Sequence, residues 1–190
     1  MSRTILFAVG GLVLGGIIHI AIIFLVPTYS TRDAWTSVGR FGDDNQFHLL
    51  PRSEPGTEPL PYLDPSMTYA VCRFSLAKGP VRMQAKLPDA FWSLAIFDRR
   101  GRNLYSLNDR SAENGALDLV VATPLQVAEL KQTPRETLEP SITIESPATG
   151  GFALLRVFVS DPTLAEPAAV ALGGAACNAP IDGAISRLPP

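Results

Sequence analysis

Charged side chains, histidine and cysteine are all scarce in this sequence of 190 residues. Charged residues make up 18% of the chain and hydrophobic residues 46%, and the formal net charge is −2. The hydrophobic content argues against a disordered chain. The charge balance argues against nucleic acid as a partner, because binding to phosphates needs clustered Lys and Arg. The segments around Lys78 and Lys131 form no such cluster.

Catalytic and metal-binding motifs are missing as well. The chain has no G-x-S-x-G, G-x-G-x-x-G, P-loop, H-E-x-x-H or C-x-x-C sequence. Beyond the N-terminal apolar segment the only histidine is His48, so a Ser-His-Asp triad would need it as the base. We therefore expect no metal and no cofactor, and we assign no catalytic residue. A non-catalytic protein is favoured over an enzyme, although the sequence leaves this open.

What the chain does contain begins with a long apolar segment. Residues 5–26 carry no charge, and as a helix they would span about 33 Å, enough to cross a hydrocarbon core of about 30 Å. This favours an uncleaved anchor at residues 1–27. A cleaved signal peptide stays open because Thr28, Tyr29 and Ser30 form a small-x-small triplet. A buried soluble helix would need a polar face, which the segment lacks.

The orientation of the anchor follows from its flanks. The positive charges on the two sides are nearly balanced, with Arg3 before the segment and Arg32 and Arg40 after it. The short N-terminal tail leaves little to translocate, and the large C-terminal part resembles an exported domain. We therefore expect a cytoplasmic N-terminus and a C-terminal domain on the outer side of the membrane.

One side of the apolar segment carries small residues and a histidine. Gly11, Gly15 and His19 are spaced four residues apart and would share a helix face. A G-x-x-x-G pair lets a second helix approach closely, and His19 would then hydrogen-bond to it. The partner would be a second copy or another anchor. In the alternative interpretation, His19 only leans toward the outer interface.

The two cysteines allow two interpretations. Cys72 lies in the apolar run TYAVCRFSL and Cys177 near the C-terminus, and neither has a metal-ligand neighbourhood. In an exported domain they would form a disulfide between the tail and a core strand. Two separate buried thiols are the alternative.

Proline marks the boundary between the anchor and the main domain. Residues 28–61 are rich in Pro and Gly, which predicts a linker or a strap on the domain surface. Residues 62–190 then form the main domain. Its short alternating runs, such as VRMQAKL at 81–87 and FWSLAIF at 91–97, predict antiparallel strands. In the second run, Trp92 would face the core.

Turn and helix signals complete the predicted fold. Asp98 and Gly101 bracket a tight turn, Asn114-Gly115 predicts a hairpin, and Gly150-Gly151 a hairpin or a bulge. Thr123-Pro124 begins a helix, and the Ala-rich tail after residue 162 allows another. The sequence thus predicts a mainly β fold, an antiparallel sandwich or jelly-roll-like domain with one or two short helices and one N-terminal transmembrane helix.

The densest polar segment is DRRGRNLYSLNDR, residues 98–110. Arginines present paired donors to carboxylates and phosphates, so the segment predicts an anion or sugar site. The candidate ligand-binding residues are Asp98, Arg99, Asn103, Tyr105 and Arg110. A solvated hairpin tip with self-paired charges explains most of the same residues.

The same region resembles a known family. Its first block contains Phe74, Leu76, Gly79, Pro80 and Val81, and its second contains Pro88, Asp89, Trp92, Ser93, Asp98, Asn103 and Arg110. These blocks resemble the domain-of-unknown-function family twelve-fifty-four, and the N-terminus resembles its short membrane-anchored alphaproteobacterial branch. This resemblance implies a single-pass protein of the bacterial inner membrane with a periplasmic C-terminal domain. The resemblance implies a jelly-roll-like domain that accompanies a sister domain of a second unknown family. This chain is short for both, so the resemblance implies a separate, similarly anchored sister protein. The family has no established reaction.

Two functions follow as hypotheses. The first is a single-span envelope protein whose periplasmic β-sandwich is a binding or assembly module, paired with the sister-domain membrane protein or with a second copy through the anchor helix. The alternative is a carbohydrate-active or other hydrolytic enzyme whose cleft the partner completes.

Overall fold

Alternating apolar and polar side chains give a strand one buried face and one more exposed face. In this computed structural model, which describes residues 2–29, 34–52, 56–112, 116–132 and 142–178, strand β4 (Trp92–Asp98) alternates buried and half-buried residues along its whole length. Trp92, Leu94 and Ile96 are buried, which confirms the predicted inward face. The strand β3 (Val81–Lys86) alternates in the same way.

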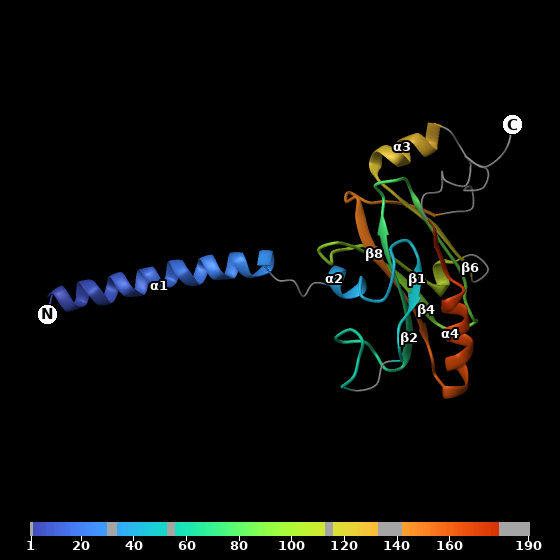
Figure 1. The fold of residues 1–190 in the computed structure, drawn as a ribbon, viewed down its shortest axis with the longest axis horizontal. Coiled ribbons are helices and arrows are strands. Elements are labelled where there is room, and N and C mark those ends of the chain that lie inside the picture. The colour runs from blue at the N-terminus through green and yellow to red at the C-terminus, as the bar shows by residue number, and fades with distance from the viewer. Residues whose placement is uncertain (1, 30–33, 53–55, 113–115, 133–141, 179–190) are drawn as a thin grey trace. The chain divides into compact units, whose positions relative to one another are not determined.

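The strands form two sheets packed face to face, as the sandwich prediction required (Figure 1). The five-stranded sheet has the order β1-β2-β8-β4-β5, with β1 (Phe47–Leu49), β2 (Met67–Ser75), β8 (Gly150–Phe158) and β5 (Asn103–Asn108) beside β4. The four-stranded sheet has the order β7-β6-β3-β9, with β7 (Ile142–Glu145), β6 (Ala116–Ala122) and β9 (Ala176–Asn178) beside β3.

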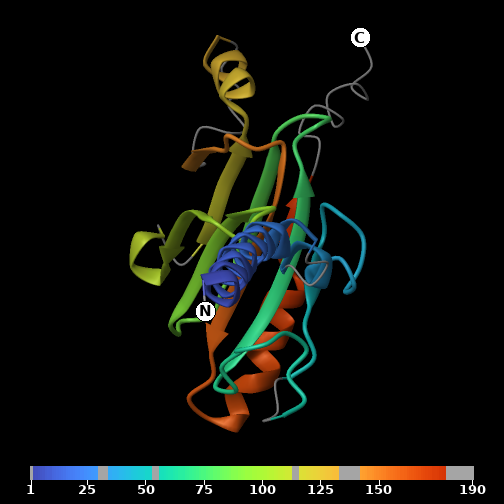
Figure 2. The same cartoon turned by 90° about the vertical axis from the view of Figure 1, so that its left-hand side faces the viewer.

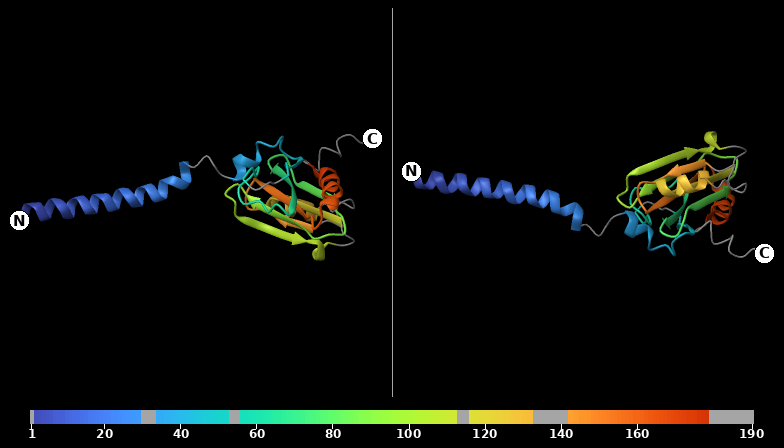
Figure 3. Two further views of the ribbon diagram at one scale, coloured as in Figure 1. Left: turned by 90° about the horizontal axis from the view of Figure 1, so that it is seen from below. Right: turned by 90° about the horizontal axis from the view of Figure 1, so that it is seen from above.

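The main core lies between the two sheets. Its fully buried side chains include Trp92, Phe74, Met83 and Leu155. Helix α4 (Ala165–Gly173) adds Ala168 and Leu172 to this core, and Figure 3 shows it along one side of the sandwich. Burial of this apolar surface is the dominant stabilising contribution to such a domain.

A second, smaller core lies on the outer face of the five-stranded sheet. It contains Val38, Leu50, Tyr69, Val71 and Phe152, and Trp35, Phe41 and Leu63 pack against it. Helix α2 (Ala34–Val38), Leu50 just after β1 and the segment around Leu63 thus cover β2 and β8 from outside. These covering segments fall largely within residues 28–61, where the sequence predicted a linker or strap.

Of the two hairpin predictions, the one at Gly150-Gly151 is wrong, and the one at Asn114-Gly115 lies outside the described residues. Gly150 and Gly151 do not form a hairpin or a bulge; they lie inside β8, opposite Ser75 and Phe74 of β2. The preceding strand, β7, belongs to the other sheet and pairs with β6 in parallel, so the connection crosses between sheets. Asn114-Gly115 lies outside the described residues, and its flanking strands, β5 and β6, belong to different sheets.

The predicted turn and helices are present. The N–H of Gly101 donates to the carbonyl oxygen of Asp98 at 3.0 Å between β4 and β5. Helix α3 (Pro124–Gln132) begins with a reciprocal cap, in which Thr123 N–H donates to Gln126 Oε1 at 2.9 Å and Gln126 N–H to Thr123 Oγ1 at 3.4 Å. Figure 2 shows α3 at one end of the sandwich and the start of α4 at the other.

The N-terminal helix α1 (Ser2–Tyr29) forms a unit of its own, separate from the body at residues 34–190. Within it, Arg3–Val26 is long and apolar enough to cross a membrane by length and composition, with a mean hydropathy of 2.6.

Candidate binding sites of the sandwich

The carboxylate of Asp98 is an internal partner of the turn that it begins. Asp98 is 2% exposed and accepts hydrogen bonds from the backbone N–H of Arg100 and Arg102 and from Arg102 Nε, at 2.8, 3.0 and 2.7 Å. Burial by itself raises the pKa of this carboxyl group, but the hydrogen bonds from Arg102 and Arg100 outweigh it and hold the pKa below its ordinary value. The ionised carboxylate of Asp98 therefore stabilises the turn.

The arginines of the turn line a small concavity, and one of them also contacts a tryptophan. Asp98, three arginines and the segment 148–150 line a space of about 250 Å³. The guanidinium carbon of Arg99 lies 4.7 Å from the ring centroid of Trp35, and that of Arg73 lies 5.1 Å from it. Such contacts are cation–π interactions, and they hold the start of the body against the sheet end.

The other three predicted ligand residues lie elsewhere. Asn103 is on the outer face of the sheet, whereas Tyr105 pairs with Ile96 and packs toward the core between the sheets. Arg110 is exposed in the 3-10 turn Asp109–Ser111. At the rise per residue of a β-strand, it lies roughly 20 Å along the chain from Asn103. The five residues therefore do not converge on one site.

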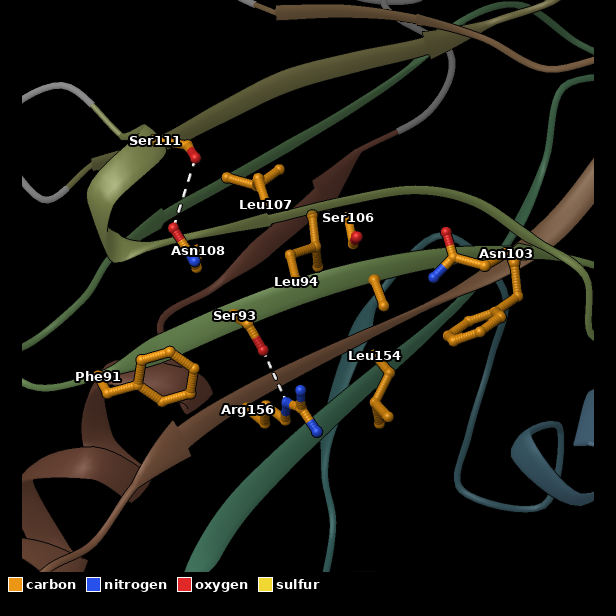
Figure 4. Close-up of a pocket in the computed structure, with 12 residues that line it drawn as sticks. Phe91, Ser93, Leu94, Asn103, Ser106, Leu107, Asn108, Ser111, Leu154 and Arg156 are labelled. Carbon is orange, nitrogen blue, oxygen red and sulfur yellow. Dashed lines mark hydrogen bonds between the residues drawn. The ribbon is translucent and has the colours of Figure 1, made fainter.

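The outer face of β4, β5 and the adjoining part of β8 forms an open groove, hereafter the outer groove (Figure 4). Its volume is about 420 Å³. The apolar part includes Phe91, Phe97, Ala95 and Leu154, and the polar part Ser93, Asn103, Ser106, Asn108 and Arg156. Phe97 stacks on Phe152, with ring centroids 5.1 Å apart, which connects the groove to the second core.

Three hydrogen bonds position polar groups at the outer groove. Arg156 Nε donates to Ser93 Oγ at 2.6 Å, from β8 to β4, and Figure 4 shows the rest of the guanidinium beside the groove. The side-chain oxygen of Asn108 accepts from the N–H of Arg110 at 3.1 Å and from Ser111 Oγ at 3.4 Å. Among the described lining residues, the polar groups are hydroxyls, amides and one guanidinium, which bind ligands by hydrogen bonds.

Sequence reasoning missed Arg156 and Ser93 as groove residues. Arg156 stands in the apolar run GFALLRVFVS, and alternation along that strand places it on the outer face with Leu154. The pairing of Arg156 with Ser93 depends on β8 lying beside β4, which no local pattern discloses.

A neighbouring concavity of about 500 Å³ shares Phe91 with the outer groove and contains the carboxylates of Asp89 and Asp109. Asp109 Oδ1 is buried without a hydrogen-bond partner. In the part of the chain that the structure describes, no group of three or more His, Cys, Asp or Glu side chains is arranged to hold a metal ion.

Cys72 and Cys177 form a disulfide, the first of the two alternatives that the sequence allowed. Their Cα atoms are 6.6 Å apart, and the bond joins β2 of one sheet to β9 of the other. Disulfides persist in oxidising compartments. The bond and the apolar N-terminal helix, whether signal or anchor, indicate a location outside the cytoplasm.

Gly11, Gly15 and His19 lie at four-residue intervals on the uninterrupted helix α1 and so on one side of it. A side chain built on either glycine would meet no atom within 4 Å, so this side of the helix is smooth.

The fold and these features define an extracytoplasmic β-sandwich module with an apolar N-terminal helix. Residues 45–173 match the family described as "Protein of unknown function (DUF1254)", and the chain belongs to this family. No curated protein matches it.

The fold also occurs in the solved structure of a longer chain. The VPA0106 protein from Vibrio parahaemolyticus is 12% identical, with a TM-score of 0.57 over 82% of this chain and 35% of that chain. An uncharacterised protein from Burkholderia cenocepacia is 14% identical, with a TM-score of 0.42 over 68% of this chain and 37% of that chain. The chain thus spans about a third of the length of these solved relatives.

Proposed function

We propose that this protein is a single-span inner-membrane protein that displays a periplasmic binding module, and that the outer groove is the surface that binds its partner. The observation that carries the proposal is the unequal cover of the five-stranded sheet. Segments from residues 34–66 pack over β2 and β8, whereas β4 and β5 leave a groove with apolar, amide and guanidinium groups.

The composition of the outer groove supports a role in binding another protein. Apolar rings supply buried area, and a positioned arginine supplies directional hydrogen bonds, the two features that dominate interface energies. Strand β5 is at the edge of its sheet, so its backbone groups on that side offer further hydrogen bonds to an extended segment.

The partner we favour is a sister-domain protein anchored in the same membrane. In the Vibrio parahaemolyticus structure the part similar to this chain is about a third of a longer chain, so the same sandwich occurs there with additional polypeptide. A separate chain would supply the corresponding contacts here.

Substitution in the outer groove tests this proposal. The full chain is co-expressed with the anchored sister-domain protein, and the complex is measured in detergent by light scattering and titration. We expect Arg156→Ala to weaken the complex tenfold or more, because truncation of an arginine that dominates an interface costs about 2 kcal/mol or more, and about 1.4 kcal/mol is tenfold in affinity. Arg110→Ala, which removes an exposed arginine outside the groove, is the matched control.

An unchanged affinity of the Arg156→Ala variant would contradict the groove as the partner surface. Turnover of a polysaccharide by the purified complex would instead favour the hydrolytic alternative.

The anchor contributes a second contact in this proposal. The face with Gly11, Gly15 and His19 would pack against another span, either the sister protein's anchor or a second copy. Cross-linking in membranes should show association that Gly15→Leu and His19→Leu abolish. Val13→Leu adds bulk on the opposite side of the helix and should leave association intact. Association that survives the first two substitutions would contradict the contact.

A further inference from the structure

The turn between β4 and β5 concentrates positive charge at one end of the sandwich. Arg99, Arg100 and Arg102 are exposed within four residues, and Asp98 is the only acidic residue of the segment 98–102. Arg102 is already paired with Asp98, through Nε and Oδ2 at 2.7 Å. Among the described residues, Arg99 and Arg100 have no carboxylate within salt-bridge distance.

The turn fixes the backbone of these arginines, and contacts position the guanidinium groups of Arg99 and Arg102. Asp98 accepts two backbone N–H groups as well as the guanidinium of Arg102. Gly101 has a φ of +78°, a conformation that glycine adopts without strain. The guanidinium of Arg99 lies over the Trp35 ring and beside Gly150. A Cβ atom on Gly150 would lie only 3.0 Å from Arg99 Nε. A fixed geometry lowers the entropy cost of binding a ligand to the guanidinium groups.

The same end of the sandwich receives the chain from the N-terminal helix. Trp35 is the second residue of the body, and it contacts Arg99 directly. Four residues, 30–33, separate the last residue of α1 from Ala34. A chain of that length reaches at most about 18 Å. The covalent connection alone therefore keeps Trp35, and with it the arginine turn, close to where α1 ends.

We propose that the arginine turn docks on the phosphate groups of anionic phospholipids in the leaflet from which α1 emerges. This inference rests on the proposed function, since it requires α1 to be retained as a membrane span. Guanidinium groups bind phosphate oxygens through paired, charge-assisted hydrogen bonds. Docking would hold one end of the sandwich at the membrane surface.

The experiment uses the full chain in lipid nanodiscs of phosphatidylcholine alone or mixed with phosphatidylglycerol. Because Cys72 and Cys177 are bonded to each other, a Thr149→Cys substitution introduces a single reactive thiol beside the arginine turn. A fluorophore on this thiol reports docking through lipids that carry a quencher in the headgroup. We expect quenching in the phosphatidylglycerol discs, weak quenching in phosphatidylcholine, and loss of the difference at 1 M salt, where the screening length is about 3 Å.

Paired variants separate docking from a general charge effect. Arg99→Gln with Arg100→Gln should lower the docked-to-free ratio about fivefold for each arginine removed. Lys86→Gln with Arg110→Gln makes the same charge change at the other end of the sandwich and should leave quenching unchanged.

Two results overturn the inference separately from its basis. A chain that co-elutes with the discs but shows equal quenching in both lipids, or unchanged quenching after loss of Arg99 and Arg100, overturns the docking alone. A chain that does not co-elute with the discs overturns the retained span and the docking with it.

Discussion

Asp98 stabilises the folded state through its charge. Its pKa is below the ordinary value in the fold, so its contribution is fully present above the unfolded pKa of about 3.9 and is lost as the pH falls through the folded pKa. We expect Asp98→Asn to lower the free energy of unfolding by about 1–3 kcal/mol at neutral pH, because it removes the partner of Arg102. Urea unfolding across a pH series measures both effects.

Two comparisons in the pH series serve as controls for the Asp98 prediction. The stability of the wild type should approach that of Asp98→Asn below about pH 4. Asp89→Asn, an exposed carboxylate, should change stability little at any pH. A constant difference between wild type and Asp98→Asn down to strong acid would contradict the role of the ionised form.

Gly151, opposite Asp98 on β8, is required for a steric reason. A Cβ there would lie 2.2 Å from the carbonyl oxygen of Phe97 and 2.8 Å from the Phe74 ring. Gly151→Ala should therefore lower the unfolding free energy by about 1–3 kcal/mol or more, the cost of overpacking a core. Gly173→Ala meets no atom within 4 Å and should be neutral or stabilising in thermal melts. Similar melting temperatures for the two variants would refute the argument.

At the scale of elements, the disulfide holds the shortest strand of the smaller sheet. Strand β9 has three residues, and Cys177 at its centre is bonded to Cys72, 105 residues earlier. Closing a loop of this length restricts the unfolded chain, so removal of both cysteines as Cys72→Ala with Cys177→Ala should cost about 2–5 kcal/mol. Denaturation with and without reductant measures this, and only the wild type should respond to the reductant.

Local sequence patterns predicted which segments form strands and helices better than they predicted which strands lie side by side in the sheets. Alternation in β4 and the cap at Thr123 act over a few residues, and the sequence shows both. The parallel pairing of β6 with β7 and the place of β8 between β2 and β4 depend on long-range packing. The candidate site shows the same limit, because Arg156 and Ser93 are 63 residues apart and meet only in the sheet.

At the scale of the whole molecule, the core of the body is built without α1. Both core clusters contain only residues from Phe47 or Trp35 onward, and no residue of α1 for which burial is described is buried. A protein of residues 34–190 should therefore fold and form its disulfide with the same thermal midpoint as the full chain in detergent. A clearly lower midpoint, or loss of the cooperative transition, would show that α1 contributes to the stability of the body.

The central position of β8 has a consequence for how the protein is made. Synthesis and export deliver a chain from its N-terminus, so β2 and β4 emerge well before the strand that both pair with. Until Gly150–Phe158 arrives, those two strands expose unpaired backbone edges and apolar faces. The five-stranded sheet can close only in one late step. A chain interrupted before residue 150 would consequently be a substrate for chaperones or proteases, because β2 and β4 would lack the strand that joins them.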